Sequence, residues 1–269
     1  MKTVYTCFPG GRNKALSFSY DDGNAADRKL VDLFNRQGLK GTFHLNSGTL
    51  GRGENVSAAE VASLYAGHEV SSHTVTHPNL LHCPAEQTAL QVLEDRRRLE
   101  DLVGYTVRGL SYPYGAWNRE VASRLASLGV EYARLTETTG QFYMEEDWLA
   151  WRTTCHHRER LLDQARRFTD ISSRHQLSWF TVWGHSYEFD REDNWNLIEE
   201  CGGLLGGRTD TWYATVIEMV DYMKAARSLR VAAAADFAEN PAGRPVWLAV
   251  DGKTVEVPAG GSVRLSGGE

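Results

Sequence analysis

The sequence lacks three features that would place it in a specialised class of protein. Its cysteines, Cys7, Cys83, Cys155 and Cys201, form no Cys-x-x-Cys pair, so neither a zinc knuckle nor a disulfide framework is expected. There is no run of about 18 apolar residues, and no apolar core of a secretory signal near the start, so no membrane span or leader is predicted. Positive charge is also scarce: the net charge of -6 argues against nucleic acid as the main partner.

The composition is otherwise that of an ordinary globular protein, with 42% hydrophobic residues and 8 tryptophans among 269 residues. A chain of this length can bury one large core and still carry a small appendage. We expect a cytoplasmic protein with neither a membrane nor a nucleic acid as partner. A secreted protein whose leader had been removed would look the same. The sequence gives no indication of an oligomeric state.

Predicted strands and helices alternate along most of the chain. Apolar periodicity predicts helices at 25–37, 57–66, 84–103, 121–128, 158–175, 194–200 and 212–227, and strands at 16–20, 40–45, 68–72, 107–112, 131–135 and 177–183. This alternation is typical of parallel βαβ units with right-handed crossovers. Because roughly 250 residues is the usual size of an α/β barrel, that is the predicted fold class.

Two segments depart from the alternation. Residues 136–157 are irregular and rich in aromatic residues. Residues 245–265 hold two short alternating runs on either side of Asp-Gly, which predicts a β-hairpin. We therefore divide the chain into an α/β barrel at 1–240 and a β-hairpin tail at 241–269 packed on it.

The first predicted strand ends at two adjacent carboxylates, Asp21 and Asp22, followed by Gly23. Because successive residues leaving a strand point in different directions, the two aspartates need not share a role. One can bind a metal while the other accepts a proton, and a nearby cation would offset their repulsion. Taken alone, Asp-Asp-Gly is also an ordinary turn sequence.

Two histidines four residues apart, His73 and His77, follow the third predicted strand. On a helical turn this spacing places both imidazoles on one side. Two neutral imidazoles and one carboxylate are a common set for zinc and neighbouring divalent ions, and the carboxylate can come from Asp22. A lone His-x-x-x-His can also be two surface residues beside a turn. Here, however, Tyr114 and His185 also fall at strand ends, where α/β barrels carry their chemistry.

These motifs, in this order, resemble those of the polysaccharide deacetylases of carbohydrate esterase family four, the NodB-like deacetylases. The family's Thr-Phe-Asp-Asp-Gly is matched by Ser-Tyr-Asp-Asp-Gly at 19–23, and its His-Ser/Thr-x-x-His by 73–77. Its Arg-x-Pro-Tyr-Gly is matched in part at 111–115, and its Leu-x-His stands as Trp-Gly-His at 183–185. The resemblance covers about 15–231 and implies a distorted (β/α)7 barrel, here with a small C-terminal β-hairpin appendage.

The resemblance implies a role for each matched residue. Asp21 would be the general base that takes a proton from metal-bound water, and His185 the general acid that protonates the leaving group. The backbone N–H of Tyr114 would stabilise the oxyanion. A divalent metal, zinc first and cobalt, nickel or manganese as alternatives, would be held by Asp22, His73 and His77.

Two parts of the family pattern are missing. The arginine of the third motif, which in the family orients the base, is Ser111 here, and Arg134 or Arg108 could supply its charge. The fourth motif, an aspartate followed by an aromatic residue, has only a loose echo at 146–148. These departures indicate a divergent branch of the family, and they leave the substrate more open than the chemistry.

Four further side chains are candidates for substrate binding: Trp117, Arg134, Trp183 and Tyr187. Glu188 and Asn194 follow the strand that carries His185 and are plausible residues of the same cleft. Trp117 can equally be a core residue, because its ring is large and apolar. The pair at 156–157, His-His, can bind substrate or a second metal, or can be purely structural.

We therefore expect a metal-dependent hydrolase that removes an acyl group, most often acetyl, from a carbohydrate. The main alternative is an amide hydrolase that acts on a small non-sugar molecule, because the third-motif arginine is absent. A second alternative is a non-catalytic sugar-binding barrel. Against it stand five retained polar residues: Asp21, Asp22, His73, His77 and His185.

Overall fold

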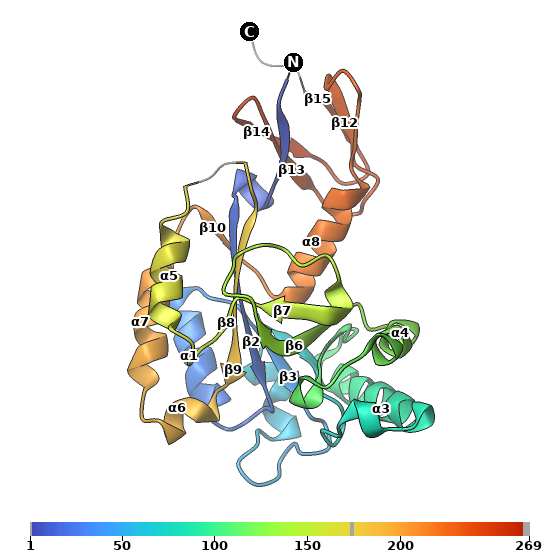
Figure 1. Ribbon diagram of the computed structural model, residues 1–269, viewed down its shortest axis with the longest axis vertical. Helices are drawn as coiled ribbons and strands as arrows, with labels where there is room; N and C mark the ends of the chain where they lie inside the picture. The colour runs from blue at the N-terminus through green and yellow to red at the C-terminus, as the bar shows by residue number, and fades with distance from the viewer. Residues whose placement is uncertain (1, 173–174, 266–269) are drawn as a thin grey trace.

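The computed structural model describes residues 2–172 and 175–265. Within these ranges, parallel strands form the centre of the molecule, helices pack around them, and small β-sheets lie at one end (Figure 1). Residues 173–174, near the end of the helix predicted at 158–175, lie outside the described residues, as do 266–269 of the predicted tail.

The central strands run parallel in the order β6, β5, β4, β3, β2, β9. β2 pairs with β3 over its last four residues and with β9 along its whole length. This arrangement confirms the predicted α/β class. The bounds of these strands are β2 (Lys14–Asp21), β3 (Gly41–Leu45), β4 (Glu69–Ser72), β5 (Gly109–Ser111), β6 (Tyr132–Thr138) and β9 (Ser178–His185).

The ends of this sheet meet in a segment that the sequence predicted to be irregular. β7 (Trp151–Thr153) pairs with β6, and β8 (Cys155–His156) pairs with β9. Only Thr154 separates them, and its N–H donates to the carbonyl of Thr181 at 3.1 Å. Among the described residues this gives a ring of seven strands if β7 and β8 are counted as one, the predicted distorted barrel. The expectation for 136–157 was wrong here, because these short strands pair with strands distant in sequence and leave little local pattern.

β2 is buried on both faces rather than on one. Its apolar residues, Phe18 among them, belong to the main hydrophobic core under the helices. Its serines lie on the opposite face, as the alternation of strand side chains requires. There Ser19 Oγ contacts His44 Nε2 of β3 and accepts from Arg134 Nε of β6, both at 3.0 Å. A polar network therefore fills the barrel directly below Asp21.

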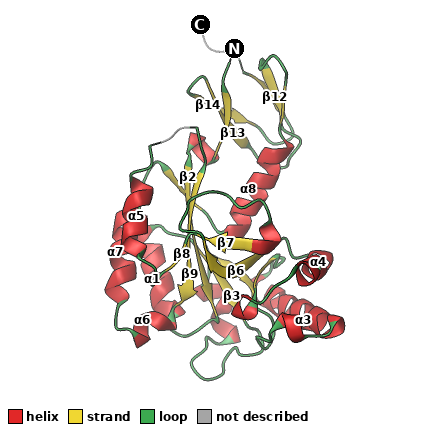
Figure 2. Cartoon of the chain, viewed as in Figure 1, coloured by secondary structure: helices red, strands yellow, loops and turns green. Residues whose placement is uncertain are grey.

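Helices cover the outside of the barrel (Figure 2), with α1, α5 and α7 on one flank and α3 and α4 on another. α1 ends at Gly38, whose φ of 67° suits a residue without a Cβ. The helices are α1 (Asp27–Gln37), α2 (Val61–Leu64), α3 (Ala85–Val103), α4 (Arg119–Ser127), α5 (Leu161–Thr169), α6 (Tyr187–Arg191), α7 (Trp195–Leu205) and α8 (Val216–Ser228).

Several predicted helix boundaries were wrong. The helix predicted at 158–175 corresponds to α5, which spans only Leu161–Thr169. The helix predicted at 194–200 continues to Leu205 through Gly202, where a Cβ would lie 1.4 Å from Gln37 Oε1. Gly202, which has no side chain, permits close packing of α7 against the end of α1. The helix predicted at 212–227 starts later, because β10 (Thr211–Tyr213) first pairs with β2.

The predicted C-terminal hairpin is present and belongs to a larger β-structure. β13 (Val246–Val250) and β14 (Lys253–Val257) form the hairpin, and β1 (Val4–Cys7) joins it antiparallel to β13. A second small sheet contains β11 (Arg230–Val231), β12 (Phe237–Glu239) and β15 (Ser262–Arg264). These sheets lie near the start of β2, at the end of the barrel away from Asp21 (Figure 1). The domain boundary at residue 240 stays a prediction.

No helix within the described residues has the length and apolar character needed to span a membrane.

Candidate active site

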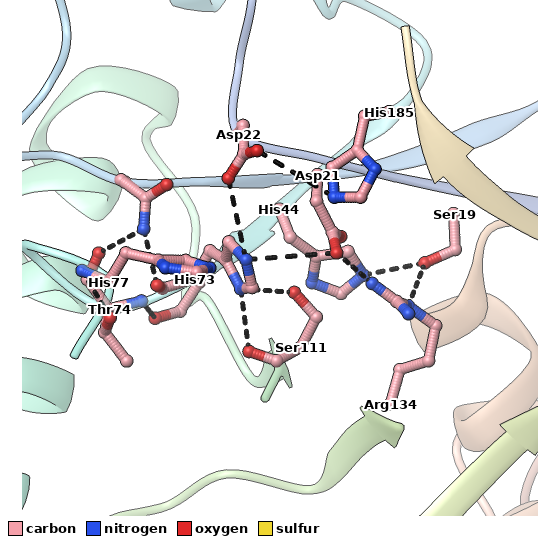
Figure 3. Close-up of polar contacts among 12 residues, drawn as sticks. Ser19, Asp21, Asp22, His44, His73, Thr74, His77, Ser111, Arg134 and His185 are labelled. Atoms are coloured by element: carbon pink, nitrogen blue, oxygen red, sulfur yellow. Dashed lines mark hydrogen bonds and ion pairs between the residues drawn. The ribbon is translucent and has the colours of Figure 1, made fainter. Parts of the chain in front are cut away.

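Asp21 ends β2 and is only 3% exposed. Arg134 donates from Nη2 to Asp21 Oδ2, and the same guanidinium donates to the Leu135 carbonyl at 3.0 Å (Figure 3). Burial alone would raise the pKa of Asp21, but the charges of Arg134 and of nearby histidines outweigh it and hold that pKa well below its usual range. Asp21 is therefore ionised, as a proton acceptor must be.

Of the two arginines that could supply the charge of the missing third-motif arginine, Arg134 is the one that contacts Asp21. Ser111 stands on β5, and Arg134 reaches Asp21 from the neighbouring strand β6. The other candidate, Arg108, instead forms a two-pronged pair with Asp221, with both N–O distances at 2.8 Å. Trp183 lies under Arg134, whose guanidinium carbon is 4.5 Å from the ring centroid. Arg134 and Trp183 were predicted to bind substrate, but both are buried, with 1% and 8% of their surface exposed. Arg134 contacts Asp21, and Trp183 packs against Arg134.

Asp22 is half-buried and faces the histidines (Figure 3). Its Oδ1 lies 3.7 Å from His73 Nε2, and its Oδ2 lies 3.9 Å from His185 Nε2. Its φ of 78° turns its side chain away from the interior network that holds Asp21. The two adjacent aspartates therefore have different surroundings, as expected.

His73 follows β4 and is almost completely buried. Its Nδ1 lies 2.8 Å from the carbonyl oxygen of Ser111 and 2.6 Å from its hydroxyl. Because a carbonyl can only accept, Nδ1 carries the proton and the lone pair of Nε2 faces Asp22. Sequence reasoning missed this contact, since a backbone carbonyl leaves no signature in the sequence.

His77 completes the group, with its ring centroid 4.6 Å from that of His73 and 4.5 Å from that of Tyr114. Burial, and to a lesser degree His73, lowers the pKa of His77, which keeps the ring neutral. The backbone N–H of His77 donates to Thr74 Oγ1 at 3.1 Å, so the two histidines lie in a turn.

The backbone around these residues is strained. Left-handed φ values occur at Asp22 (78°), Thr74 (69°), His77 (56°) and Tyr114 (60°). Each such non-glycine residue costs on the order of 1–3 kcal/mol and persists only where its surroundings fix it. Strain collected in three loops around one group of side chains is an independent sign of a functional site.

The donor set fits a divalent cation. One donor atom from each of Asp22, His73 and His77 lies within 4.8 Å of the other two. A carboxylate and two neutral imidazoles suit zinc and similar ions and leave positions open for water and substrate. The contact from Ser111 to Nδ1 of His73 is the kind that orients a metal-binding imidazole.

His185 ends β9 beside Asp22, and its Nδ1 faces Oε2 of Glu188. Burial by itself would lower the pKa of His185, but Glu188, Asp21 and Asp22 outweigh it and raise the pKa above its usual value. A protonated ring is what a general acid requires. The pKa of Glu188 is well below its usual range, because His156, His157 and His185 outweigh the effect of burial.

The remaining candidates have different surroundings. Tyr187 stacks on His185 with ring centroids 5.1 Å apart, and the guanidinium carbon of Arg191 lies 4.2 Å from the Tyr187 ring centroid. Tyr187 also lines a cleft of about 720 Å³ with residues 24–26, Glu54 and the end of α6. Trp117 is half-buried against the hydrophobic cluster of α3 and α4. Tyr114 is 68% exposed at the rim.

Comparison with known proteins points to the family that the motifs resemble. Residues 9–133 match the family model described as polysaccharide deacetylase. This part of the chain is therefore similar to a polysaccharide deacetylase domain. The predicted resemblance is thereby confirmed. The matched residues include Asp21 and His73, whereas Arg134 and His185 lie beyond them.

The relatives of this part of the chain are distant. Peptidoglycan-N-acetylglucosamine deacetylase PgdA of Listeria monocytogenes is 27% identical over 127 residues, which are 46% of this chain and 27% of that protein. A chitin deacetylase of Pestalotiopsis sp is 26% identical over 133 residues, 49% of this chain and 45% of that protein. The chain thus spans less than half the length of these relatives. A family 4 carbohydrate esterase from Streptomyces lividans shares the fold, with a TM-score of 0.53, 16% identity and coverage of 76% and 93% of the two chains.

Proposed function

We propose that this protein is a metal-dependent hydrolase that removes acetyl or similar acyl groups from a carbohydrate. The observation that carries the proposal is the convergence of three chemical functions at the ends of β2, β4 and β9. These are a buried carboxylate whose pKa is lowered, three side chains that could hold a divalent metal, and a histidine whose pKa is raised. Metal-assisted hydrolysis needs all three within reach of one acyl group.

The chain's own residues divide the reaction between them. Asp22, His73 and His77 would hold a divalent cation, which when bound polarises the acyl oxygen and lowers the pKa of water beside it. Asp21 accepts a proton from the attacking water, and Arg134 keeps that carboxylate in place. The backbone N–H of Tyr114 is placed in this scheme as a donor to the oxyanion.

His185 completes the reaction. As the bond between the acyl carbon and the leaving nitrogen or oxygen breaks, Nε2 of His185 gives its proton to that leaving atom. The acyl group then departs as a carboxylate that contains the oxygen of water. The short distance from His185 to Asp22 supports this role, because it brings the acid to the same side as the ligands.

The named activities of the relatives indicate which substrate to test first. One is named for N-acetylglucosamine in peptidoglycan and another for chitin. An N-acetylated glucosamine oligomer is therefore the first candidate. The small-molecule amide hydrolase becomes a weaker alternative, since it rested on the absent arginine, whose charge Arg134 supplies.

The test is acetate release from acetylated chitin, xylan and peptidoglycan fragments, with zinc, with cobalt or after treatment with a chelator. We expect turnover on at least one glycan, which chelation abolishes and zinc restores. Asp21→Asn should lower kcat by about 100-fold or more, in the range that general acid–base catalysis contributes, while bound metal stays unchanged. Affinity for a glycan without acetate release would support the non-catalytic alternative, and activity confined to small amides would support the other.

A further inference from the structure

Three imidazoles converge on one oxygen of Glu188. Its Oε2 lies 3.2 Å from Nε2 of His156, 3.2 Å from Nε2 of His157 and 3.4 Å from Nδ1 of His185. Its other oxygen, Oε1, lies 3.0 Å from Nη1 of Arg158. Glu188 is buried in α6, which follows β9. This group of charged and polar side chains therefore lies next to His185, the candidate general acid.

By spacing alone, His156, His157 and Glu188 could hold a second metal, since their donor atoms lie within 4.8 Å of one another. Two contacts oppose that reading. The N–H of Arg158 donates to Nδ1 of His156 at 3.2 Å, so the neutral ring keeps its proton on Nε2, where a metal would need the lone pair. The guanidinium of Arg158 also supplies the positive charge that Glu188 requires.

The contacts instead fix the ring of His185. The N–H of His185 donates to Glu188 Oε2 at 3.1 Å, and its Nδ1 faces the same oxygen. In this orientation Nδ1 faces the carboxylate of Glu188, which can accept a proton carried there, and Nε2 is the ring atom presented toward Asp22. Tyr187 covers one face of the ring by stacking and limits its rotation.

Glu188 is itself held in place. Nε2–H of His156 points at it from one side, and His157 is completely buried on another. Close approach of His157 depends on Gly184 in β9, where a Cβ would lie 2.1 Å from His157 Nδ1. The carboxylate therefore has little freedom to leave His185.

We propose that Glu188 is the positioning residue of this site, which holds His185 so that Nε2 delivers its proton to the leaving atom. The proposal rests on the function proposed above. This role predicts a dependence on the leaving group. An amine must be protonated as its bond to the acyl carbon breaks, whereas 4-nitrophenolate leaves as an anion.

The experiment uses the full chain loaded with zinc and compares two substrates. These are an N-acetylated chitooligosaccharide and 4-nitrophenyl acetate. Glu188→Ala should lower kcat on the oligosaccharide by about 100-fold, leave KM nearly unchanged and alter 4-nitrophenyl acetate hydrolysis by less than about threefold. Glu188→Asp should recover part of the loss. The matched control is Glu192→Ala, since Glu192 pairs with Nη2 of the same Arg158 one turn further along the chain.

Equal losses on both substrates in Glu188→Ala would overturn the proposal and reduce Glu188 to a structural role. So would a second equivalent of zinc in the wild type that Glu188→Ala loses. The wild-type rates test the proposed function separately. The role of Glu188 is tested only by comparing the loss of rate that Glu188→Ala causes on the one substrate with its loss on the other. Should the oligosaccharide not be cleaved, ¹⁵N NMR still decides. The Nδ1 proton of His185 should be protected from exchange in the wild type and Glu192→Ala and lost in Glu188→Ala, and an unchanged signal would refute the proposal.

Discussion

At the scale of single residues, two neighbouring strands supply polar contacts to Asp21 and His73. The guanidinium that contacts Asp21 comes from Arg134 on β6, and position 111 on β5 carries a serine whose carbonyl orients His73. Neighbouring parallel strands bring both positions to the same end of the barrel, as the pairing of Ser111 with Arg134 shows. A guanidinium group on β6 can therefore reach the same place at the end of the barrel as one on β5.

Arg134→Lys tests the contact with Asp21. A lysine has one ammonium and cannot reproduce the planar fork that contacts Asp21, Ser19 and the Leu135 carbonyl together. We expect kcat for acetate release to fall by about 10- to 100-fold, of the order seen when supporting contacts of an active site are lost, with metal content unchanged. Arg108→Lys is the control, because Arg108 pairs with Asp221 instead. Wild-type kcat in Arg134→Lys would remove this residue from the site.

At the scale of elements, β4 has a titratable side chain at its start and another directly after its end. Its C-terminal end leads to His73, and its first residue, Glu69, is buried in the barrel. Glu69 accepts from Tyr132 Oη at 2.7 Å, from Thr42 Oγ1 at 2.8 Å and from the N–H of Ile217 at 2.9 Å. Burial raises the pKa of Glu69 from 4.5 to about 7, although these donors oppose the shift.

The raised pKa makes stability depend on pH. Because the folded state binds the proton of Glu69 more tightly than the unfolded chain, its contribution is complete below about pH 4.5 and is lost as pH rises through about 7. Between pH 5 and 8, the free energy of unfolding should fall by up to about 3 kcal/mol more in the wild type than in Glu69→Gln. Urea denaturation at the two pH values measures this difference. The exposed Glu86→Gln should behave as the wild type, and parallel pH curves for Glu69→Gln and the wild type would contradict the prediction.

At the scale of the whole molecule, segments from the two ends of the sequence are joined to the barrel. β1 pairs with β13, and the side chain of Asp221 in α8 links Arg108, near β5, with Arg244, just before β13. The Asp221 oxygens lie 2.8 Å from Arg108 and 3.0 Å from Arg244. The β-structure is thus tied to the end of the barrel away from the candidate site.

Asp221→Asn should weaken this link. The amide cannot pair with two guanidinium groups as a carboxylate does, so we expect a loss of about 1 kcal/mol and a fall in Tm of about 2–4 °C. Calorimetry measures the change. Glu120→Gln is the control, because its pair with Arg124 lies on an exposed helix surface and should contribute less. A Tm equal to that of the wild type in Asp221→Asn would show that these ion pairs do not help to hold the β-structure.

The sequence by itself determined the alternation of strands and helices, the C-terminal hairpin and the resemblance to a family. These depend on local periodicity, on an Asp-Gly turn and on short motifs, all of which lie within a few neighbouring residues. The residues named for metal binding and for proton transfer also lie together in the structure. Their individual roles stay predictions.

Only the tertiary structure decided how the barrel closes and which groups support the site. The strands β7 and β8 are too short to show a period, and they exist because β6 and β9 pair with them. Arg134 is 113 positions from the aspartate that it contacts. Glu188 is three positions from His185, yet three further contacts with His156, His157 and Arg158 give it its environment. Charge and burial are set by neighbours in space, and distance along the chain carries no information about them.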